Sequence, residues 1–252
     1  MMCADVVRRT VSSIRSNLQN PIKRWNLVSN DDFQNELSRF FWAKRLYYER
    51  RQCEWKYRKL ELCGVGIARG PDIRWMTQLI AASHYDKKKL GPAVAQGRLN
   101  ELFDEDAYSV IRNTPPTTAY QLYLVAEILD RCLRRLSNKK QYIRNLKGYV
   151  NLCAFSLLNR ILKEAHVPLG RETMEARFEQ IHKDDAREWE IATKALVDYI
   201  VVAFKRASAR EWREEGNRLT PANYFKNLAM ISDLIKRPIP QQLCRISKLV
   251  AS

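Results

Sequence analysis

The hydrophobic residues of this chain recur mostly at steps of three and four positions, the spacing that places them on one side of a helix. The pattern is clearest in the second half of the sequence, which is typical of an array of helices joined by short loops. There it predicts helices over residues 117–136, 140–164, 183–215 and 221–236. In the first half it predicts helices over residues 4–18, from Asn30 and from Asp72.

Residues 46–67 do not follow this helical spacing. Short apolar runs at Leu46–Tyr48 and Val65–Ile67 could be strands, with a heavily charged stretch between them. The chain has only 8 glycines and 9 prolines, fewer than an all-β protein needs for its turns. We therefore predict a mainly α fold, a multi-helix array with at most a small β-hairpin within residues 45–70.

The charge balance of the chain is strongly positive. Lys and Arg number 44 against 28 Asp and Glu, which gives a formal net charge of +16. A positive field of this size attracts polyanions, and nucleic acid is the commonest such partner, with anionic membrane second.

The positive charge is most concentrated in residues 131–163, which contain no Asp or Glu. Helical spacing places Lys140, Arg144 and Lys147 in one narrow sector beside the apolar side of their helix. An ordinary solvated face, or neutralisation by acids of the predicted 183–215 helix, would also account for this charge. We predict instead that the segment contacts the phosphates of DNA or RNA. The predicted nucleic-acid-binding residues are Arg134, Arg135, Lys139, Lys140, Arg144 and Lys147.

The six cysteines and three histidines of the chain do not show the spacing of a metal site. We predict no metal site, no cofactor and reduced thiols, as in a cytoplasmic protein. No apolar run approaches the roughly 20 residues of a membrane span, so we expect none. The tryptophans lie mostly at the spacing of helix cores, so we do not interpret them as platforms for stacking bases.

Three blocks in the first half of the chain carry a family resemblance. Residues 16–22 (SNLQNPI) are similar to an N-x-Q-N-P-I signature, and residues 27–34 (LVSNDDFQ) to L-x-S-N-D-x-x-Q. Residues 47–55 (YYERRQCEW) are similar to (F/Y)-Y-E-R-(R/K)-x-G-E-W, with Cys53 in place of the usual glycine. Weaker similarity follows at residues 92–108. In this order and spacing the blocks resemble the AIPR (abortive infection phage resistance) family. The motif residues are Asn17, Gln19, Asn20, Asn30, Asp31, Gln34, Tyr48, Glu49, Arg50, Glu54 and Trp55.

The resemblance implies a role in bacterial defence against phage. It divides the chain into a motif region, residues 1–113, and a helical region, residues 114–252, that we expect to pack on the first as one unit. Family members usually carry an N-G-x-Q motif upstream of the first block. The chain contains no Asn-Gly, so we expect a fragment or a short form of a longer protein. We also expect the motif blocks to lie close together in space.

Two weak patterns leave a nuclease open as an alternative. Glu54 and Lys56 fit the E-x-K half of a restriction-type site, in which Mg²⁺ would be held by Glu54 and an upstream acid such as Asp31. Glu49 is a further carboxylate candidate. Arg160 and His166, like Arg177 and His182, fit the Arg-x4-6-His signature of HEPN-type RNases. Because arginine is abundant here, each match also occurs readily by chance.

Two hypotheses follow from the sequence. In the first, the chain is a phage-defence module that binds nucleic acid or another defence protein without catalysis of its own. In the alternative, it is an abortive-infection nuclease, and only this version would use Mg²⁺. The sequence favours binding and leaves enzymatic activity uncertain.

Overall fold

The computed structural model describes residues 23–85, 87, 89–166, 174–176, 179, 187–216, 218–241, 243 and 246, without the side chain of residue 147. The predicted helix over residues 4–18 lies outside this part of the chain. The described first half holds α2 (Arg24–Val28), α3 (Asp32–Ala43), β1 (Leu46–Glu49), α4 (Glu54–Gly64), β2 (Ala68–Asp72), α5 (Ile73–Ser83), α6 (Pro92–Gly97), the 3₁₀ helix η1 (Leu99–Phe103) and α7 (Glu105–Arg112). The second half holds α8 (Pro116–Lys139), α9 (Gln141–Glu164), α11 (Arg187–Glu215), α12 (Pro221–Lys226) and α13 (Leu228–Lys236).

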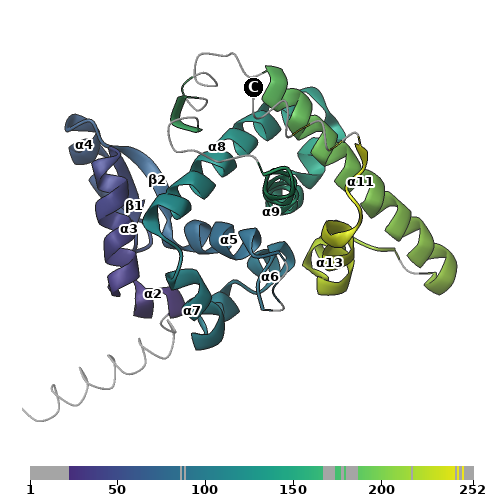
Figure 1. The fold of residues 1–252 in the computed structure, drawn as a ribbon, viewed down its shortest axis with the longest axis horizontal. Coiled ribbons are helices and arrows are strands. Elements are labelled where there is room, and N and C mark those ends of the chain that lie inside the picture. Colours follow the sequence, from purple (N-terminus) through teal and green to yellow (C-terminus); the bar gives the residue numbers. More distant parts are fainter. Residues whose placement is uncertain are drawn as a thin grey trace, which may run out of the picture.

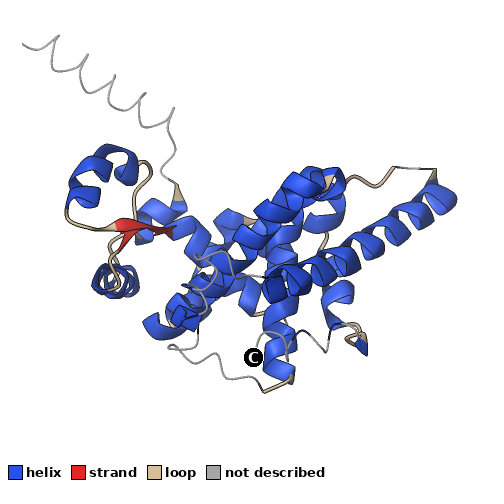
Figure 2. Ribbon diagram, turned by 90° about the horizontal axis from the view of Figure 1, so that it is seen from above, coloured by secondary structure: helices blue, strands red, loops and turns tan. Residues whose placement is uncertain are grey.

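The fold is mainly α-helical with one small two-stranded sheet, as predicted (Figures 1 and 2). The long helices of the second half follow the predicted apolar pattern closely. On α8, Leu122, Leu129 and Leu136 are all buried, and the predicted apolar side of α9, including Val150 and Leu157, is buried too.

Helix α9 is the centre of the packing. Helices α5, α6, α8, α11, α12 and α13 all contact it, and Figure 1 shows α9 end-on with its neighbours around it. Every residue from Leu152 to Asn159 is buried. A helix with this much burial needs apolar residues on nearly all sides rather than in one stripe. The core around α9 also includes Phe41 of α3 and Leu79 of α5, so both halves of the sequence contribute to one core.

The small sheet corrects the predicted hairpin. Strands β1 and β2 are parallel, with Leu46 opposite Ala68 and Glu49 opposite Asp72. Parallel strands need a crossover connection, and the charged stretch between them supplies it as α4, a helix of 11 residues. The apolar run at Val65–Ile67, predicted as the second strand, instead lies in the turn before β2, which begins at Ala68.

The crossover has its own small core. Tyr47, Leu62 and Ile67 are buried together, with the half-buried Trp55 packed against them. Helix α4 exposes most of its remaining surface, including Tyr57 and Leu60. This unit is therefore held to the main body largely through β1 and α3.

A substitution at Gly70 tests how closely the two strands approach each other. A Cβ at this position would lie 2.9 Å from the carbonyl oxygen of Tyr47, a backbone atom that cannot move without disturbing β1. We expect Gly70→Ala to lower the free energy of unfolding by about 1–3 kcal/mol in chemical denaturation. Gly148→Ala is the control, because its Cβ would meet no atom within 4 Å in α9. That change should stabilise by about 0.5–1 kcal/mol, and equal effects of the two changes would contradict the steric argument.

Candidate functional site

The motif blocks at residues 27–34 and 47–55 meet in a buried hydrogen-bond network. Its centre is Gln34 on α3, which has no exposed surface. The Gln34 side-chain amide donates to the Tyr108 hydroxyl at 2.9 Å, and its carbonyl oxygen accepts from the Tyr48 hydroxyl at 2.5 Å. The Tyr108 hydroxyl in turn donates to Asp31 at 2.6 Å. Asp31 also caps α3, because its other oxygen accepts from the Gln34 backbone N–H at 2.8 Å.

Arg50 ties the same two blocks together at the edge of this network. Its guanidinium donates to the Asn35 side chain and, at 3.3 Å, to the carbonyl oxygen of Ser29. The blocks around Asn30 and Tyr48 are therefore close together, as predicted. Asn17, Gln19 and Asn20 lie outside the described residues.

The electrostatics of this network favour a structural role. Burial, with the bond to Asp31, raises the pKa of Tyr108, and burial raises the pKa of Tyr48. Both phenols therefore stay protonated near neutral pH and act as hydrogen-bond donors. Gln34 uses its amide and its carbonyl on these two hydroxyls, so no group of the network points to a ligand.

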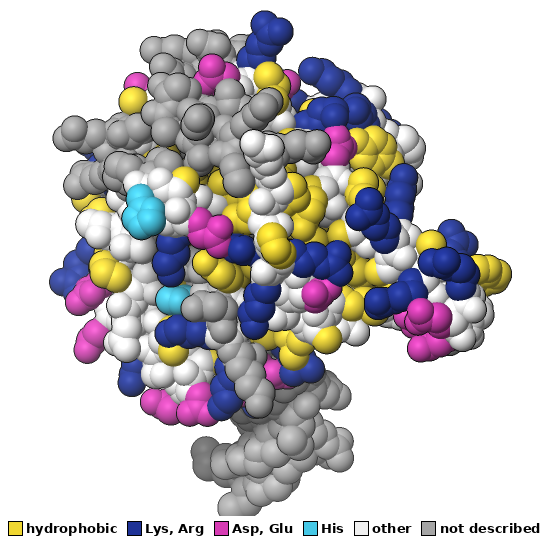
Figure 3. All heavy atoms as spheres, turned by 45° about the vertical axis from the view of Figure 1, so that its right-hand side comes forward, with side chains coloured by type: hydrophobic (Ala, Val, Ile, Leu, Met, Phe, Trp, Pro, Cys, Tyr) yellow, Lys and Arg dark blue, Asp and Glu magenta, His cyan; other side chains and the backbone are white. Residues whose placement is uncertain are grey.

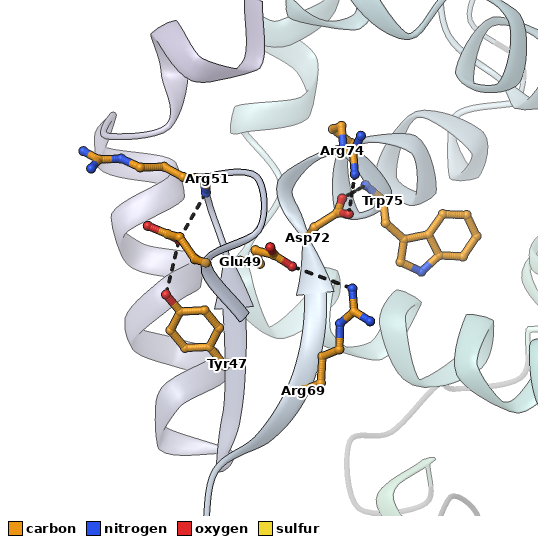
Figure 4. Close-up of polar contacts among 8 residues, drawn as sticks. Tyr47, Glu49, Arg51, Arg69, Asp72, Arg74 and Trp75 are labelled. Atoms are coloured by element: carbon orange, nitrogen blue, oxygen red, sulfur yellow. Dashed lines mark hydrogen bonds and ion pairs between the residues drawn. The ribbon is translucent and has the colours of Figure 1, made fainter. Parts of the chain in front are cut away.

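The carboxylates of the predicted nuclease site are tied up in separate contacts. Glu49 is buried at the end of β1 and pairs with Arg69 of β2 at 3.7 Å (Figure 4). Asp72, a neighbouring carboxylate at the end of β2 that was not among the predicted site residues, caps α5 through the Trp75 backbone N–H at 2.8 Å and pairs with Arg74 (Figure 4).

Glu54 does not lie at a strand end, where the E-x-K pattern would place it. It is in the first turn of α4 and accepts from the Tyr47 hydroxyl and the Arg51 backbone N–H, each at 3.2 Å. Lys56 is exposed further along the same helix. Asp31 belongs to the network around Gln34 instead. Within the described residues, no group of three or more His, Cys, Asp or Glu is placed to hold a metal ion.

Arg160 and His166 are also engaged separately. The Arg160 guanidinium pairs with Glu164 at 2.6 Å and donates to the carbonyl oxygens of Ile235 and, at 2.8 Å, Arg237. It therefore joins the end of α13 to α9. The exposed His166 ring contacts the carbonyl oxygen of Glu164 at 3.1 Å, and no hydrogen bond links it to Arg160. The second pair, Arg177 and His182, lies outside the described residues.

The predicted basic residues gather where α8 ends and α9 begins, a region that we call the basic corner: Arg134, Arg135, Lys139, Lys140, Arg144 and residue 147. Part of this charge is neutralised within the molecule. Arg134 pairs with Asp130, and one carboxylate of α11, Glu190, is shared by Arg135 at 3.3 Å and Lys139 at 3.7 Å. The acids of α11 thus offset one side of the corner, as the competing interpretation required.

The other side of the corner keeps its positive charge. Lys140 is half-buried over the ring of Tyr142, and the exposed Arg144 donates to the carbonyl oxygen of Ser137 at 3.4 Å. Asp198 of α11 lies within electrostatic reach of Lys140, but it already pairs with Lys194 and accepts from Tyr142. Although burial opposes ionisation, these hydrogen bonds and the charges of Lys194 and Lys140 lower the pKa of Asp198.

A second group of cations, on α11 and after α13, was not predicted from the sequence. Arg206, Arg210, Arg213 and Arg237 line a common hollow. The first three recur at steps of four and three, the signal that would have revealed them. The sequence pattern had indicated this helix only as a source of acids.

Gln34 tests whether the motif network is a stability element. We expect Gln34→Leu to lower the free energy of unfolding by about 2–3 kcal/mol, because two buried hydroxyls lose a partner. Tyr57→Phe is the control, since Tyr57 is 81% exposed and should tolerate loss of its hydroxyl. Thermal and urea unfolding measure both variants. A Gln34→Leu protein as stable as wild type would rule out the structural role.

The described helices do not include one that is long and apolar enough to cross a membrane. No protein-family model, curated protein or solved structure matches the chain. Any function therefore rests on the residues themselves.

Proposed function

We propose that this chain binds nucleic acid through its phosphates, as a non-catalytic module of an abortive-infection defence against phage. The observation that supports binding is the incomplete neutralisation of the basic corner. Glu190 serves two cations, and within the described residues no carboxylate lies within ion-pair distance of Arg144. A polyanion that covers mutually repelling cations relieves their repulsion, and this favours binding.

Phosphate is the chemical group that suits this surface. Lys140 and Arg144 come from the first turns of α9, one turn apart, and a phosphate backbone offers a row of charges to such a pair. The contacts would carry no sequence information, because they do not reach base edges. Counterion release would supply most of the affinity.

The non-catalytic part of the proposal rests on the separation of the candidate residues. Glu49, Glu54 and Asp31 each have their own partners, and Arg160 binds the carbonyl oxygens at the end of α13. The nuclease alternative needs at least two of these groups to converge on one reacting phosphate. No specific contact favours it.

The defence setting comes from the motif blocks. Residues that are far apart in sequence, such as Gln34 and Tyr108, join in one network built from those blocks. This supports the AIPR resemblance as a shared structural core. A second defence protein is the other partner class to consider, and the cytoplasm is the compartment in which the free Cys53 and Cys63 would stay reduced.

Alanine at Lys140, Arg144 and Lys147 together tests the proposal. We expect this triple variant to bind mixed-sequence DNA and RNA about tenfold more weakly or worse, to a similar extent for unrelated sequences. The log–log dependence of affinity on salt should also flatten by roughly one unit for each phosphate that is no longer bound. Fluorescence anisotropy across a salt series measures both.

The matched control removes the same charge elsewhere. Arg51, Lys56 and Lys59 are exposed on and just before α4, far from α11 in Figure 1. Their triple alanine variant should keep the wild-type affinity and slope. If the corner variant also keeps both but loses thermal stability, its cations serve the fold and the proposal is wrong.

A further inference from the structure

The last turns of α11 combine an exposed tryptophan with a concentration of arginines. Trp212 is 63% exposed, so it is not one of the tryptophans that serve the core. This part of α11 extends past the neighbouring helices (Figures 1 and 2). Most of the indole is therefore open to solvent.

Charge is sorted around this end of the helix. At about 100° per residue, Arg206, Arg210 and Arg213 fall within a sector of roughly 60°. Lys205 and Trp212 lie together about 80–100° beyond one edge of this sector. The carboxylates of the same turns follow its other edge, beginning about 40° beyond it: Glu214, Glu211 and Glu215. A helix that is merely solvated mixes the two signs, so the sorting marks a surface with a preferred partner.

Two hollows flank this surface. The first, about 430 Å³, lies between α11 and α13 and is lined by Arg206, Arg210, Arg213 and Arg237. Its single lining carboxylate, Asp233, is paired with Arg237. The second hollow, about 530 Å³, lies on the other side of α11 and places Trp212 between Lys205 and Arg218. Arg213 lines both. Figure 3 shows Lys and Arg side chains bordering exposed apolar atoms on this side of the molecule.

The positive charge of the arginines in the first hollow is only partly neutralised by ion pairs. Arg210 reaches Glu214 only at 4.0 Å, and the Nε of Arg213 donates to the Ala209 carbonyl oxygen at 3.2 Å. In the described part of the chain, Arg206 has no carboxylate partner. A ligand with several negative charges would therefore meet open guanidinium groups, which match phosphate oxygens in pairs.

We propose that this end of α11 binds single-stranded nucleic acid, with a base stacked on Trp212 and phosphates of the same strand passing Arg213, which lines both hollows, to the arginines of the first hollow. The inference rests on the proposed nucleic-acid binding and names the form of the ligand. An open indole beside cations suits an unpaired base, whose face is free to stack. In a duplex the faces of each base are covered by the neighbouring bases, so no base face is free to stack on Trp212.

The same features fit other polyanions less well. An acidic protein would use the arginines but has no general need of an exposed indole. An anionic membrane would favour lysine and a broad apolar face, whereas this surface is mostly arginine and Glu214 lies at its border. Both remain as outcomes of the test.

The experiment compares a labelled 12-nucleotide single strand, as RNA and as DNA, with the matching 12-base-pair duplex in fluorescence anisotropy. Wild type should prefer the single strands. Trp212→Ala should weaken single-strand binding by roughly tenfold without changing the salt slope, because stacking involves no counterion release. Trp212→Phe should restore most of the affinity. Arg206→Ala with Arg210→Ala should weaken binding and also flatten the slope, by about 0.7 for each phosphate that is no longer bound.

Controls separate this inference from the proposed function. Lys56→Ala with Lys59→Ala removes the same charge on α4 and should leave binding unchanged. If only the basic-corner variant weakens binding, or duplex and single strand bind equally and Trp212→Ala has no effect, the α11 site is wrong and general phosphate binding stands. If wild type binds no nucleic acid, both are wrong.

Binding of vesicles with 30% phosphatidylserine, or of a polyglutamate peptide, in place of nucleic acid and with the same Trp212 dependence would overturn the choice of ligand. Unchanged melting temperatures are expected throughout, because Trp212 and the two arginines are exposed.

Discussion

Helix α9 has to bury almost all of its surface between Val150 and Leu162, and the rest of the structure is arranged to make this possible. Side chains such as Phe155 and Leu158 have no exposed surface, and full burial of each contributes about 2–3 kcal/mol. Two polar side chains in this stretch find partners close by. The Ser156 hydroxyl donates to the carbonyl oxygen of Ala82, and the Asn159 amide to that of Phe155. Helices from both halves of the chain surround α9 because no single neighbour can cover it.

The burial of α9 also determines where the basic residues of the long helices lie. Since the middle of α9 cannot hold cations, the basic residues of this helix collect in its first turns, where α8 and α9 meet, and at Arg160 and Lys163 near its end. Helix α11 follows a similar division. Its first part, with Leu196 and Ile200, is buried against α8 and α9, whereas its last turns pass the core and carry the sorted arginines. The surfaces proposed for nucleic acid are thus the places where the two long helices leave the core.

The sequence predicted the features that depend on local spacing. The apolar sides of α8 and α9 follow directly from the helical period, and the helix predicted from Asn30 begins at Asp32, with Asp31 as its N-cap. The predicted orientation of the small sheet was wrong. A charged stretch of this length can form either the loop of a hairpin or a crossover helix, so the sequence did not distinguish antiparallel from parallel strands. From the sequence we could predict only that the motif blocks lie close together. The hydrogen bonds of the Gln34 network could not be predicted, because the bond between Gln34 and Tyr108 spans 74 residues and depends on side-chain geometry. The exposure of Trp212 could not be predicted from spacing alone, because the spacing does not show that the core ends before its turn of α11.

In the proposed binding, the basic corner and the end of α11 would contribute different kinds of binding energy. Asp198 illustrates the connection, since it accepts from Tyr142 beside the corner and also lines the apolar hollow that shares Arg206 and Arg237 with the arginine hollow. Attraction at the corner acts over about a Debye length and weakens with salt. Stacking on Trp212 is short in range and insensitive to salt. A strand held by both would be captured by charge and retained by its unpaired bases. Only the second step separates single strands from the duplex DNA that surrounds them in a cell.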